Sequence, residues 1–311
     1  MWHFVFLKGE KKMDGIWIVY KPKGITSHDV VKKVKHITGE KVGHAGTLDP
    51  NATGILPILV GKGTRLSSYI MNHDKTYLAV LKLGEKTDTA DGEGNVRERK
   101  EVPQYTIDEI QKVLDCFLGE QDQVPPMYSA IKIKGKKLYE YARQQQQIEV
   151  SPRRITIFAI TLLQYDVQKQ QITFRVSCSK GTYIRTLCED IAQKLETVGY
   201  MKELERIEVG NKHSGFSFSF ENAITIEQLE QNIHHKEWIN QHFVTIEMFF
   251  QEKQTLLLEE EQEKLVLNGG KMPIEKKEDI YLLRKKRNSA FIGIGKVENG
   301  FLKRELILEK D

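Results

Sequence analysis

Short runs of hydrophobic residues, separated by charged turns, recur along the chain, and their lengths fit β-strands. Segments 15–22, 75–84, 154–167 and 171–179 combine β-branched or aromatic residues with turn residues at their ends, which is typical of strands. The last two are close neighbours in the sequence, and we expect them to pair. Segment 55–61, ILPILVG, is short and apolar, which fits either a buried strand or a turn.

Other segments place apolar residues three and four positions apart, the spacing of a helix packed on one face. We expect Ser27 to cap the first such helix and Gly39 to end it. Thr106 and Glu109 form a capping-box pattern at the start of a second helix, and residues 182–195 predict a third. The mixture of strands and helices predicts an α+β fold.

The same pattern suggests how the chain divides into domains. Residues 13–235 predict one long α+β domain, with the polar HHKEW segment (234–238) as its boundary. Residues 236–311 predict a small β-rich domain, and residues 290–309 in it predict a hairpin with Glu-Asn-Gly at the turn. Residues 1–12 are expected to be a disordered appendage, which makes Met13 a candidate for the natural start.

Composition narrows the class of protein without naming a function. The chain has 311 residues, a net charge of +4 and three cysteines, none of them in a CxxC pair. Such cysteine usage fits a reducing cytoplasm, and no apolar run is long enough to span a membrane. We expect a cytoplasmic monomer without membrane contact. The mild positive charge permits a polyanionic partner, and the basic RKKR run (284–287) is either a solvated face or a phosphate contact.

Most motifs of cofactor and metal chemistry are missing. The nearest match to a phosphate loop, GKGT (61–64), lacks the required Ser or Thr and the first glycine. No Cys/His cluster has zinc spacing. The loop GHAGTLDPNATG (43–54) instead surrounds one carboxylate, Asp49, with small residues. A carboxylate presented in this way can act as a nucleophile or general base. An Asx turn before Pro50 is the alternative explanation of the loop. The loop alone favours the Asx turn.

A set of motifs in a fixed order changes this balance, because together they closely resemble the TruB family of bacterial tRNA pseudouridine synthases. The resemblance extends from residue 14 to about residue 210 and continues more weakly into a C-terminal segment similar to a PUA RNA-binding domain. The motifs are KPKGITSHDVV (21–31), VGHAGTLDPNATGILPILVGKGTR (42–65), DKTYLAVLKLG (74–84), VPPMYSAIKIKGKKLYEYAR (124–143) and CSKGTYIRTL (178–187).

The resemblance implies a fold and a reaction. The expected fold is α+β, with a catalytic domain of the pseudouridine synthase type built on a mixed, mostly antiparallel sheet and a small β-rich PUA-like domain. The expected reaction converts uridine to pseudouridine at position 55 in the T loop of tRNA. The target base has to be flipped out of the loop. No group is added or lost, so no cofactor, nucleotide cofactor or metal is expected.

The resemblance also implies roles for individual residues. Asp49 matches the nucleophile, Tyr77 the tyrosine that lies against the base and moves a proton, and Arg185 the arginine that pairs with the nucleophile. An adjacent guanidinium is expected to lower the pKa of Asp49 and keep it ionised. Without the resemblance, Tyr77 reads as a strand-packing residue and Arg185 as an ordinary helix residue.

Four further positions match substrate contacts of the family. His44 and Tyr183 match contacts to the RNA, Leu204 an apolar contact to the base, and Arg65 a phosphate contact. Read from the sequence alone, Leu204 fits the core of a helix equally well. The segment that follows it, LERIEVGNKHSGFSF (204–218), departs from the family pattern, with isoleucine where the family has threonine and extra residues before Phe216.

Three alternatives remain open on the sequence. The carboxylate of Asp49 attacks either ribose C1′ or C6 of the base. A non-catalytic RNA-binding protein or tRNA folding chaperone also fits the charge and the PUA-like tail, but such a protein has no need of the set Asp49, Tyr77 and Arg185. A synthase that acts on ribosomal RNA is a third possibility.

Overall fold

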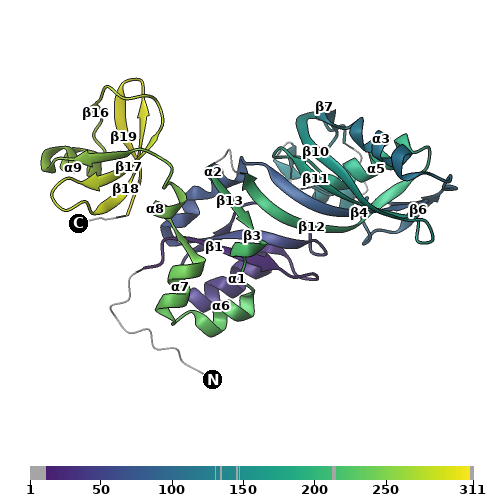
Figure 1. Ribbon diagram of the computed structural model, residues 1–311, viewed down its shortest axis with the longest axis horizontal. Coiled ribbons are helices and arrows are strands. Elements are labelled where there is room, and N and C mark those ends of the chain that lie inside the picture. Colours follow the sequence, from purple (N-terminus) through teal and green to yellow (C-terminus); the bar gives the residue numbers. More distant parts are fainter. Residues whose placement is uncertain are drawn as a thin grey trace.

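The computed structural model describes residues 12–129, 131–133, 135–144, 146, 148–211 and 215–308, so the prediction for residues 1–12 lies almost wholly outside the described residues. The molecule is elongated, with a large sheet, helices beneath one end of it, and a smaller β unit beside that end (Figure 1).

The larger sheet contains ten strands in the described residues, and its main path runs β14-β1-β3-β12-β4-β11-β10-β7, with β2 paired to β3 and β13 to β12. Nearly all neighbours are antiparallel, and the short pairing of β12 with β3 is parallel. The expected α+β class with a mostly antiparallel sheet is confirmed. The strands of this part are β1 (Gly15–Lys21), β2 (Val42–His44), β3 (Thr53–Val60), β4 (Lys75–Leu83), β5 (Glu85–Thr87), β6 (Val96–Arg99), β7 (Gly119–Gln123), β8 (Lys132–Ile133), β9 (Lys136–Lys137), β10 (Arg153–Asp166), β11 (Gln171–Cys178), β12 (Gly199–Asn211), β13 (Phe216–Ser219) and β14 (Phe243–Thr245).

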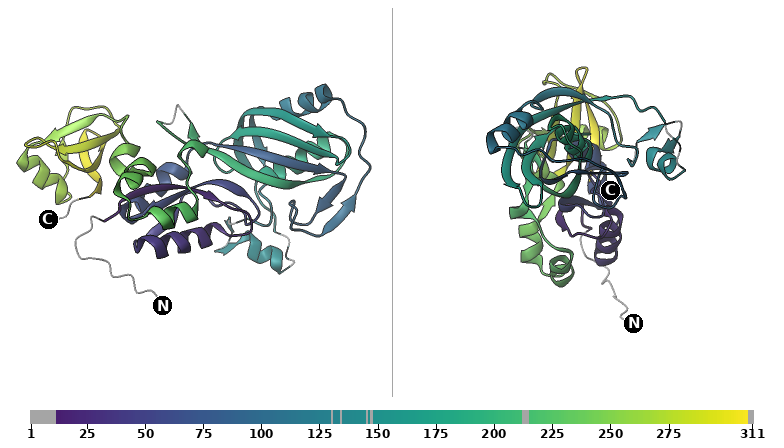
Figure 2. Two further views of the ribbon diagram at one scale, coloured as in Figure 1. Left: turned by 60° about the horizontal axis from the view of Figure 1, so that its bottom comes forward. Right: turned by 90° about the vertical axis from the view of Figure 1, so that its right-hand side faces the viewer.

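Helices cover the two ends of this sheet differently. At one end α3 and α5 bury one face of β4, β10 and β11. At the other end α1, α6 and α7 cover one face of β1 and β3, and the opposite face packs on α2, α8, β13 and the C-terminal unit. The short segment of β8, β9 and α4 stands off to one side (Figure 2). The helices are α1 (Ser27–Thr38), η1 (Gly61–Leu66), α2 (Ser67–Met71), α3 (Ile107–Asp115), α4 (Leu138–Arg143), α5 (Ile184–Lys194), η3 (Phe220–Asn222), α6 (Ile226–Asn232), α7 (Lys236–His242), α8 (Ile246–Phe249) and α9 (Glu260–Leu267).

The helix ends agree with the predictions from the sequence, except at the start of α1. Gly39 ends α1 in the left-handed conformation at φ 69°, and the capping box of Thr106 and Glu109 starts α3, both as predicted. The N-cap of α1, however, is Thr26 and not Ser27, because Thr26 forms the capping box with Asp29. Ser27 is buried and its hydroxyl bonds elsewhere.

The central strand β12 is one of the elements that the sequence pattern did not predict. Its charged positions, such as Lys202, Glu203 and Glu205, break the alternation that marks a strand. Two irregularities in its register with β4 shift those side chains locally. The alternative placement of Leu204 in a helix core is therefore wrong, since the residue lies on a strand.

The predicted boundary near residue 235 falls inside the larger unit. Helix α7 and strand β14 follow that residue, and β14 extends the sheet by pairing with β1. The ring of Trp238 on α7 stacks on Trp17 at 5.6 Å, and Phe243 on β14 lies 4.8 Å from the same ring. The smaller unit therefore begins after α8.

The smaller unit is a five-stranded sheet in the order β15-β17-β18-β19-β16. The predicted hairpin is confirmed as β18 and β19, and Asn299 and Gly300 occupy its turn with φ of 52° and 75°. The RKKR run lies at the end of β17, where each basic side chain forms an ion pair with Glu247, Glu259 or Glu263. The strands are β15 (Thr255–Leu258), β16 (Met272–Pro273), β17 (Ile280–Lys285), β18 (Phe291–Glu298) and β19 (Phe301–Ile307).

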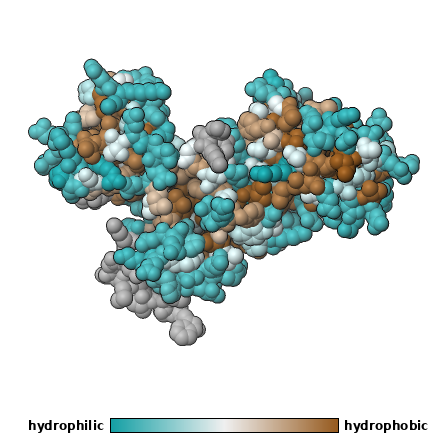
Figure 3. Space-filling model, in the orientation of Figure 1, coloured by the Kyte–Doolittle hydropathy of each residue, from teal (hydrophilic) through white to brown (hydrophobic). Residues whose placement is uncertain are grey.

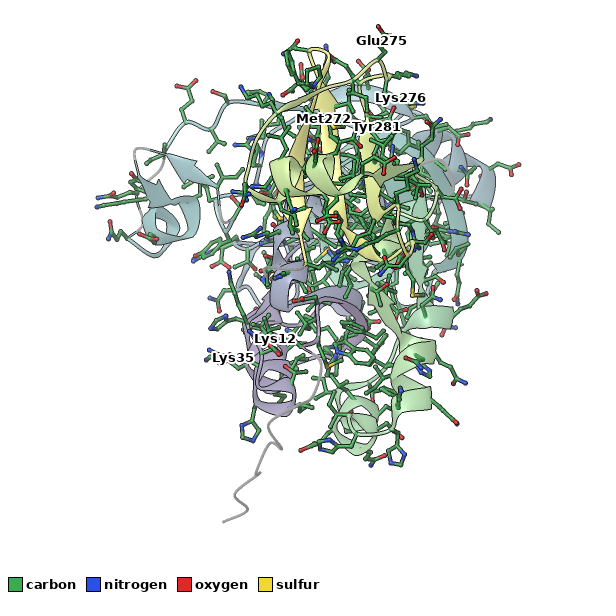
Figure 4. The ribbon with its side chains drawn as sticks, turned by 90° about the vertical axis from the view of Figure 1, so that its left-hand side faces the viewer. Lys12, Lys35, Met272, Glu275, Lys276 and Tyr281 are labelled. Carbon is green, nitrogen blue, oxygen red and sulfur yellow. The ribbon has the colours of Figure 1, made fainter. Side chains whose placement is uncertain are left out.

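The two units share a hydrophobic cluster that joins them. Phe249 and Phe250 of the α8 region pack with Leu282, Ile294 and Leu306 of the smaller sheet. Polar contacts flank this cluster, including a hydrogen bond of 2.8 Å from the Tyr69 hydroxyl to Glu305. Figure 4, viewed from this end, shows Glu275 and Lys276 at the outer end of the smaller unit, away from Lys12 and Lys35 near α1.

Candidate active site

The loop that carries Asp49 connects β2 to β3, and the side chain of a buried lysine forms hydrogen bonds with its backbone. Lys21 has no exposed surface, and its Nζ donates hydrogen bonds to the carbonyl oxygens of Pro50 at 2.9 Å and Ala52 at 2.7 Å. A third bond goes to Pro22. Burial lowers the pKa of Lys21 to about 8, although Asp49 opposes this shift. The lysine therefore fixes the part of the loop that directly follows Asp49.

Ser27 holds the same loop from α1. Its hydroxyl accepts a hydrogen bond of 2.9 Å from the backbone N–H of Leu48 and donates one of 3.0 Å to the carbonyl of that residue. Both groups are buried. The residue that the sequence suggested as a helix cap thus positions the backbone directly before Asp49.

The carboxylate of Asp49 faces the start of α5. Its Oδ2 lies 3.3 Å from Nε of Arg185, whose side chain is only 9% exposed, against 40% for Asp49. Arg185 donates a further bond of 2.8 Å to the carbonyl of Tyr128, and its Nη1 lies 3.6 Å from Asp91. The expected pairing of Asp49 with Arg185 is observed. Asp91 was not singled out from the sequence, because its segment, TADGEGNVRERKEVPQ (89–104), has the charged, turn-rich composition of a connecting loop.

The pKa of Asp49 shifts in the direction opposite to the one expected. Burial raises its pKa above the ordinary value, Arg185 opposes this rise, and the negative charge of Asp91 adds to it. The predicted lowering by Arg185 is thus present but outweighed. Arg185 divides its positive charge between two carboxylates, and the loop removes Asp49 from much of the solvent.

A cleft opens beside the carboxylate. It has a volume of about 230 Å³, and a neighbouring hollow of about 340 Å³ shares Leu204 with it. The cleft brings Leu204 and Asp49 together, as expected. The cleft is lined by Lys23, Asp49, Asn51, Ala52, Asp91, Gly92, Glu93, Tyr200, Met201, Lys202, Glu203 and Leu204.

On the scale of the whole surface, Figure 3 shows hydrophobic residues gathered along the strands of the large sheet on the face in view.

Tyr77 lies on β4, directly opposite Arg206 on β12. The two side chains are close enough for each to shift the pKa of the other. Burial raises the pKa of Tyr77, and the charge of Asp49 is close enough to raise it further. Tyr77 therefore belongs to the same group of side chains as Asp49. Arg206 was not singled out from the sequence, although it stands two residues after Leu204 in the segment that departs from the family pattern.

The remaining predicted residues lie at different distances from this group. His44 ends β2, just before the loop, and burial lowers its pKa. Tyr183 precedes α5, and its backbone is fixed by two hydrogen bonds with the side chain of Gln123. Arg65 is exposed on η1, beyond the far end of β3. At roughly 3.3 Å per residue, the eight residues of β3 separate it from the Asp49 loop by on the order of 20 Å.

The described residues contain no group of three or more acidic, histidine or cysteine side chains arranged to hold a metal ion. Among them, no helix is both long and apolar enough to cross a membrane.

Comparison with known families and curated proteins gives consistent matches along the chain. Residues 32–184 match the N-terminal domain of the TruB family of pseudouridylate synthases, and residues 185–251 match the C-terminal domain of tRNA pseudouridylate synthase B. The chain is 41% identical over 306 residues to tRNA pseudouridine synthase B of Clostridium novyi (strain NT), covering 95% of this chain and 100% of that protein. It is 46% identical over 220 residues to the protein of that name from Caldanaerobacter subterraneus subsp. tengcongensis, covering 70% and 75%.

Solved structures share the fold. The chain superposes with a TM-score of 0.67 and 22% identity on a chain of an H/ACA RNP bound to a substrate RNA containing 2′-deoxyuridine, covering 95% of this chain and 85% of that one. A chain of a Cbf5-Nop10-Gar1 complex gives a TM-score of 0.65 at 24% identity, covering 95% and 84%. At these identities the likeness concerns the fold alone. On the sequence matches, the chain belongs to the TruB family of pseudouridine synthases, which are isomerases.

Proposed function

We propose that this chain converts uridine to pseudouridine at position 55 in the T loop of tRNA, with Asp49 as the nucleophile. The bond between N1 of the base and ribose C1′ breaks, and a bond between C5 and C1′ forms. The proton on C5 leaves and N1 gains one, so the product is an isomer of the substrate and no co-reactant is consumed. The observation that carries the proposal is the Asp49 carboxylate, 3.3 Å from Arg185 beside an open cleft.

The surroundings of Asp49 suit a nucleophile. Lys21 and Ser27 hold the loop on either side, so the carboxylate is pre-positioned and little order has to be gained on binding. Arg185 stabilises the ionised form, and 40% of the Asp49 side chain remains open to a substrate. Attack at C1′ and attack at C6 both begin from this carboxylate, and we keep both routes.

A uridine within a folded loop reaches the carboxylate only if its base leaves the stack, which costs a few kcal/mol. Leu204 in the cleft and Tyr77 beside it offer an apolar wall and a ring to the extruded base. In this proposal Tyr77 also moves the C5 proton. His44 and Tyr183, which flank the group, contact the flipped nucleotide or its neighbours.

The choice of substrate rests on the relatives, which are named tRNA pseudouridine synthase B. We assign tRNA to this chain on that basis, and the T loop as its target region. The smaller unit, whose five-stranded sheet fits the expected PUA-like domain, is proposed to add affinity for the RNA and to take no part in the chemistry.

The test is release of tritium from a tRNA transcript labelled at C5 of uridine, with wild type, Asp49→Asn and Asp115→Asn. Asp115 ends α3 and is exposed, so its substitution makes the same chemical change away from the cleft. Wild type and Asp115→Asn are expected to release tritium at equal rates, and Asp49→Asn to release none while still binding tRNA.

Four results would overturn parts of the proposal. Turnover by Asp49→Asn would remove Asp49 from the role of nucleophile. Unchanged release from a transcript with cytidine at position 55 would exclude that target, and release from ribosomal RNA but not from tRNA would change the substrate. A folded wild type that binds tRNA without releasing tritium would favour a folding chaperone.

A further inference from the structure

Arg206 is among the largest side chains that are fully buried, with 1% of its surface exposed. It lies on β12 at the point where that strand touches both neighbours, opposite Tyr77 on β4 and beside Gly54 on β3. A side chain on Gly54 would place its Cβ 2.2 Å from the carbonyl oxygen of Arg206, so glycine permits this close approach of the strands. The guanidinium therefore lies between the two halves of the large sheet.

The hydrogen bonds of Arg206 connect three elements. Its Nε donates to the carbonyl of Ile55 on β3 at 2.7 Å, and its Nη2 donates to the carbonyl of Gly46 in the Asp49 loop at 2.9 Å. On the other side of β12, Tyr77 stands directly opposite Arg206, and its hydroxyl is close enough to the guanidinium to act on its pKa. A Cβ on Gly46, which has φ of 104°, would lie 3.2 Å from Nη1. One side chain thus links the loop of the nucleophile to the strand of the tyrosine.

No described carboxylate forms an ion pair with Arg206, which is unusual for a buried guanidinium, because an uncompensated buried charge is costly. Burial lowers the pKa of Arg206, and Tyr77 opposes this shift. The positive charge is therefore directed at a phenol and two carbonyl groups. A purely structural role needs only hydrogen-bond donors. A neutral side chain provides such donors without the free-energy cost of burying a charge.

We infer that Arg206 is a positioning residue for Tyr77, orienting its hydroxyl and stabilising it as the acceptor of the C5 proton. A guanidinium only donates hydrogen bonds, so the oxygen of Tyr77 faces it as an acceptor and the hydroxyl proton of Tyr77 is directed away from it. That proton passes to N1 as the bond between N1 and C1′ breaks. Once the bond between C5 and C1′ has formed, the resulting phenolate takes the proton from C5, and the electron pair of that C–H bond restores the C5–C6 double bond. This inference rests on the proposed role of Tyr77 in proton transfer.

The first test is a double-mutant cycle on the single-turnover rate of tritium release, with Tyr77→Phe, Arg206→Lys and the double variant. We expect Arg206→Lys to lower the single-turnover rate about tenfold when Tyr77 is present, which corresponds to roughly 1.4 kcal/mol. In the Tyr77→Phe background we expect the same substitution to have little effect on the rate. Additive losses would overturn the inference. A wild-type rate for Tyr77→Phe would instead remove the proton-transfer role of Tyr77 itself, which distinguishes the two failures.

A second measurement applies if Tyr77→Phe is too slow for the cycle. Incorporation of 3-fluorotyrosine at position 77 makes the phenol more acidic, and it is expected to recover part of the rate lost by Arg206→Gln. A purely structural Arg206 would not be rescued in this way, so the absence of recovery would contradict the inference. Arg154→Gln, at an exposed position of β10, is the matched control and is expected to release tritium at the wild-type rate.

Discussion

At the scale of single residues, the site is a group of ionisable side chains that lie close enough to influence one another. Arg185 lies between Asp49 and Asp91, and Arg206 lies against Tyr77. Burial opposes charge on Asp49, Tyr77 and Arg206, and the neighbouring opposite charges only partly offset it. The two ion pairs of Arg185, at 3.3 and 3.6 Å, join side chains that are distant in the sequence.

The raised pKa of Asp49 predicts how activity depends on pH. In the proposed mechanism Asp49 attacks as the ionised carboxylate, so a raised pKa moves the acid limb of the rate to a pH above that of an ordinary aspartate. Asp91 contributes to the rise. Asp91→Asn is therefore expected to let Asp49 lose its proton at lower pH and to move the acid limb downward.

The measurement is the single-turnover rate of tritium release between pH 4.5 and about 8, within the range where proteins usually remain folded. Asp88→Asn is the control, since Asp88 lies in the same charged turn but pairs with Arg97. An acid limb that moves upward in Asp91→Asn would contradict the electrostatic account of Asp49.

At the scale of elements, the start of α1 shows how one short segment does two different things. Thr26 caps the helix through the N–H of Asp29, and Ser27 bonds the backbone of Leu48 in the Asp49 loop. The two hydroxyls are adjacent in the sequence but serve different parts of the structure. Helix α1 is therefore both a packing element and a support for Asp49.

This division predicts different results for two small substitutions. Thr26→Ala removes a cap and is expected to cost about 1 kcal/mol in the free energy of unfolding with unchanged turnover. Ser27→Ala leaves the buried N–H of Leu48 without its partner, which costs roughly 1–3 kcal/mol, and it also loosens the loop. Denaturant unfolding and single-turnover rates, measured on both variants, check this.

The decisive comparison is of the rates. Ser27→Ala is expected to slow turnover on the order of tenfold, with tRNA affinity close to that of wild type. Equal rates for the two alanine variants would mean that the Ser27 contact does not position Asp49.

At the scale of the whole molecule, the chain is a large sheet unit and a smaller β unit joined through a shared apolar cluster. Strand β14 completes one edge of the large sheet after the chain has passed through α6 and α7. The basic RKKR run of the smaller unit is paired with carboxylates, so of its two readings the phosphate contact is the less favoured.

This arrangement changes what truncation is expected to do. A chain ended at residue 235, near the boundary expected from the sequence, lacks α7 and β14, which cover Trp17. We expect it to lose its native fold. A chain ended at residue 251 keeps both elements, and we expect it to retain turnover with weaker binding of tRNA.

Thermal unfolding, circular dichroism and tritium release on the two truncated chains make the comparison. A native spectrum and wild-type unfolding temperature for the chain ended at 235 would show that α7 and β14 are dispensable. Complete loss of turnover by a natively folded chain ended at 251 would give the smaller unit a role in the chemistry.

Local features were determined by the sequence alone. Gly39 ends α1, Thr106 and Glu109 begin α3, and the Asn-Gly turn joins β18 to β19, because each depends on neighbours within a few residues. Motif order was equally informative about the family, since GTLDP and GTYIR are contiguous segments that need no knowledge of the fold.

Only the tertiary structure decided which distant residues meet. Strand β12 carries charges that hide its alternation, and its place between β3 and β4 brings Arg206 to Tyr77 and to the Asp49 loop. The rise in the pKa of Asp49 likewise depends on burial and on Asp91, neither of which is visible along the chain. Burial and charge pairing act through space, so a one-dimensional pattern points to Asp49 but does not show the environment that shifts its pKa.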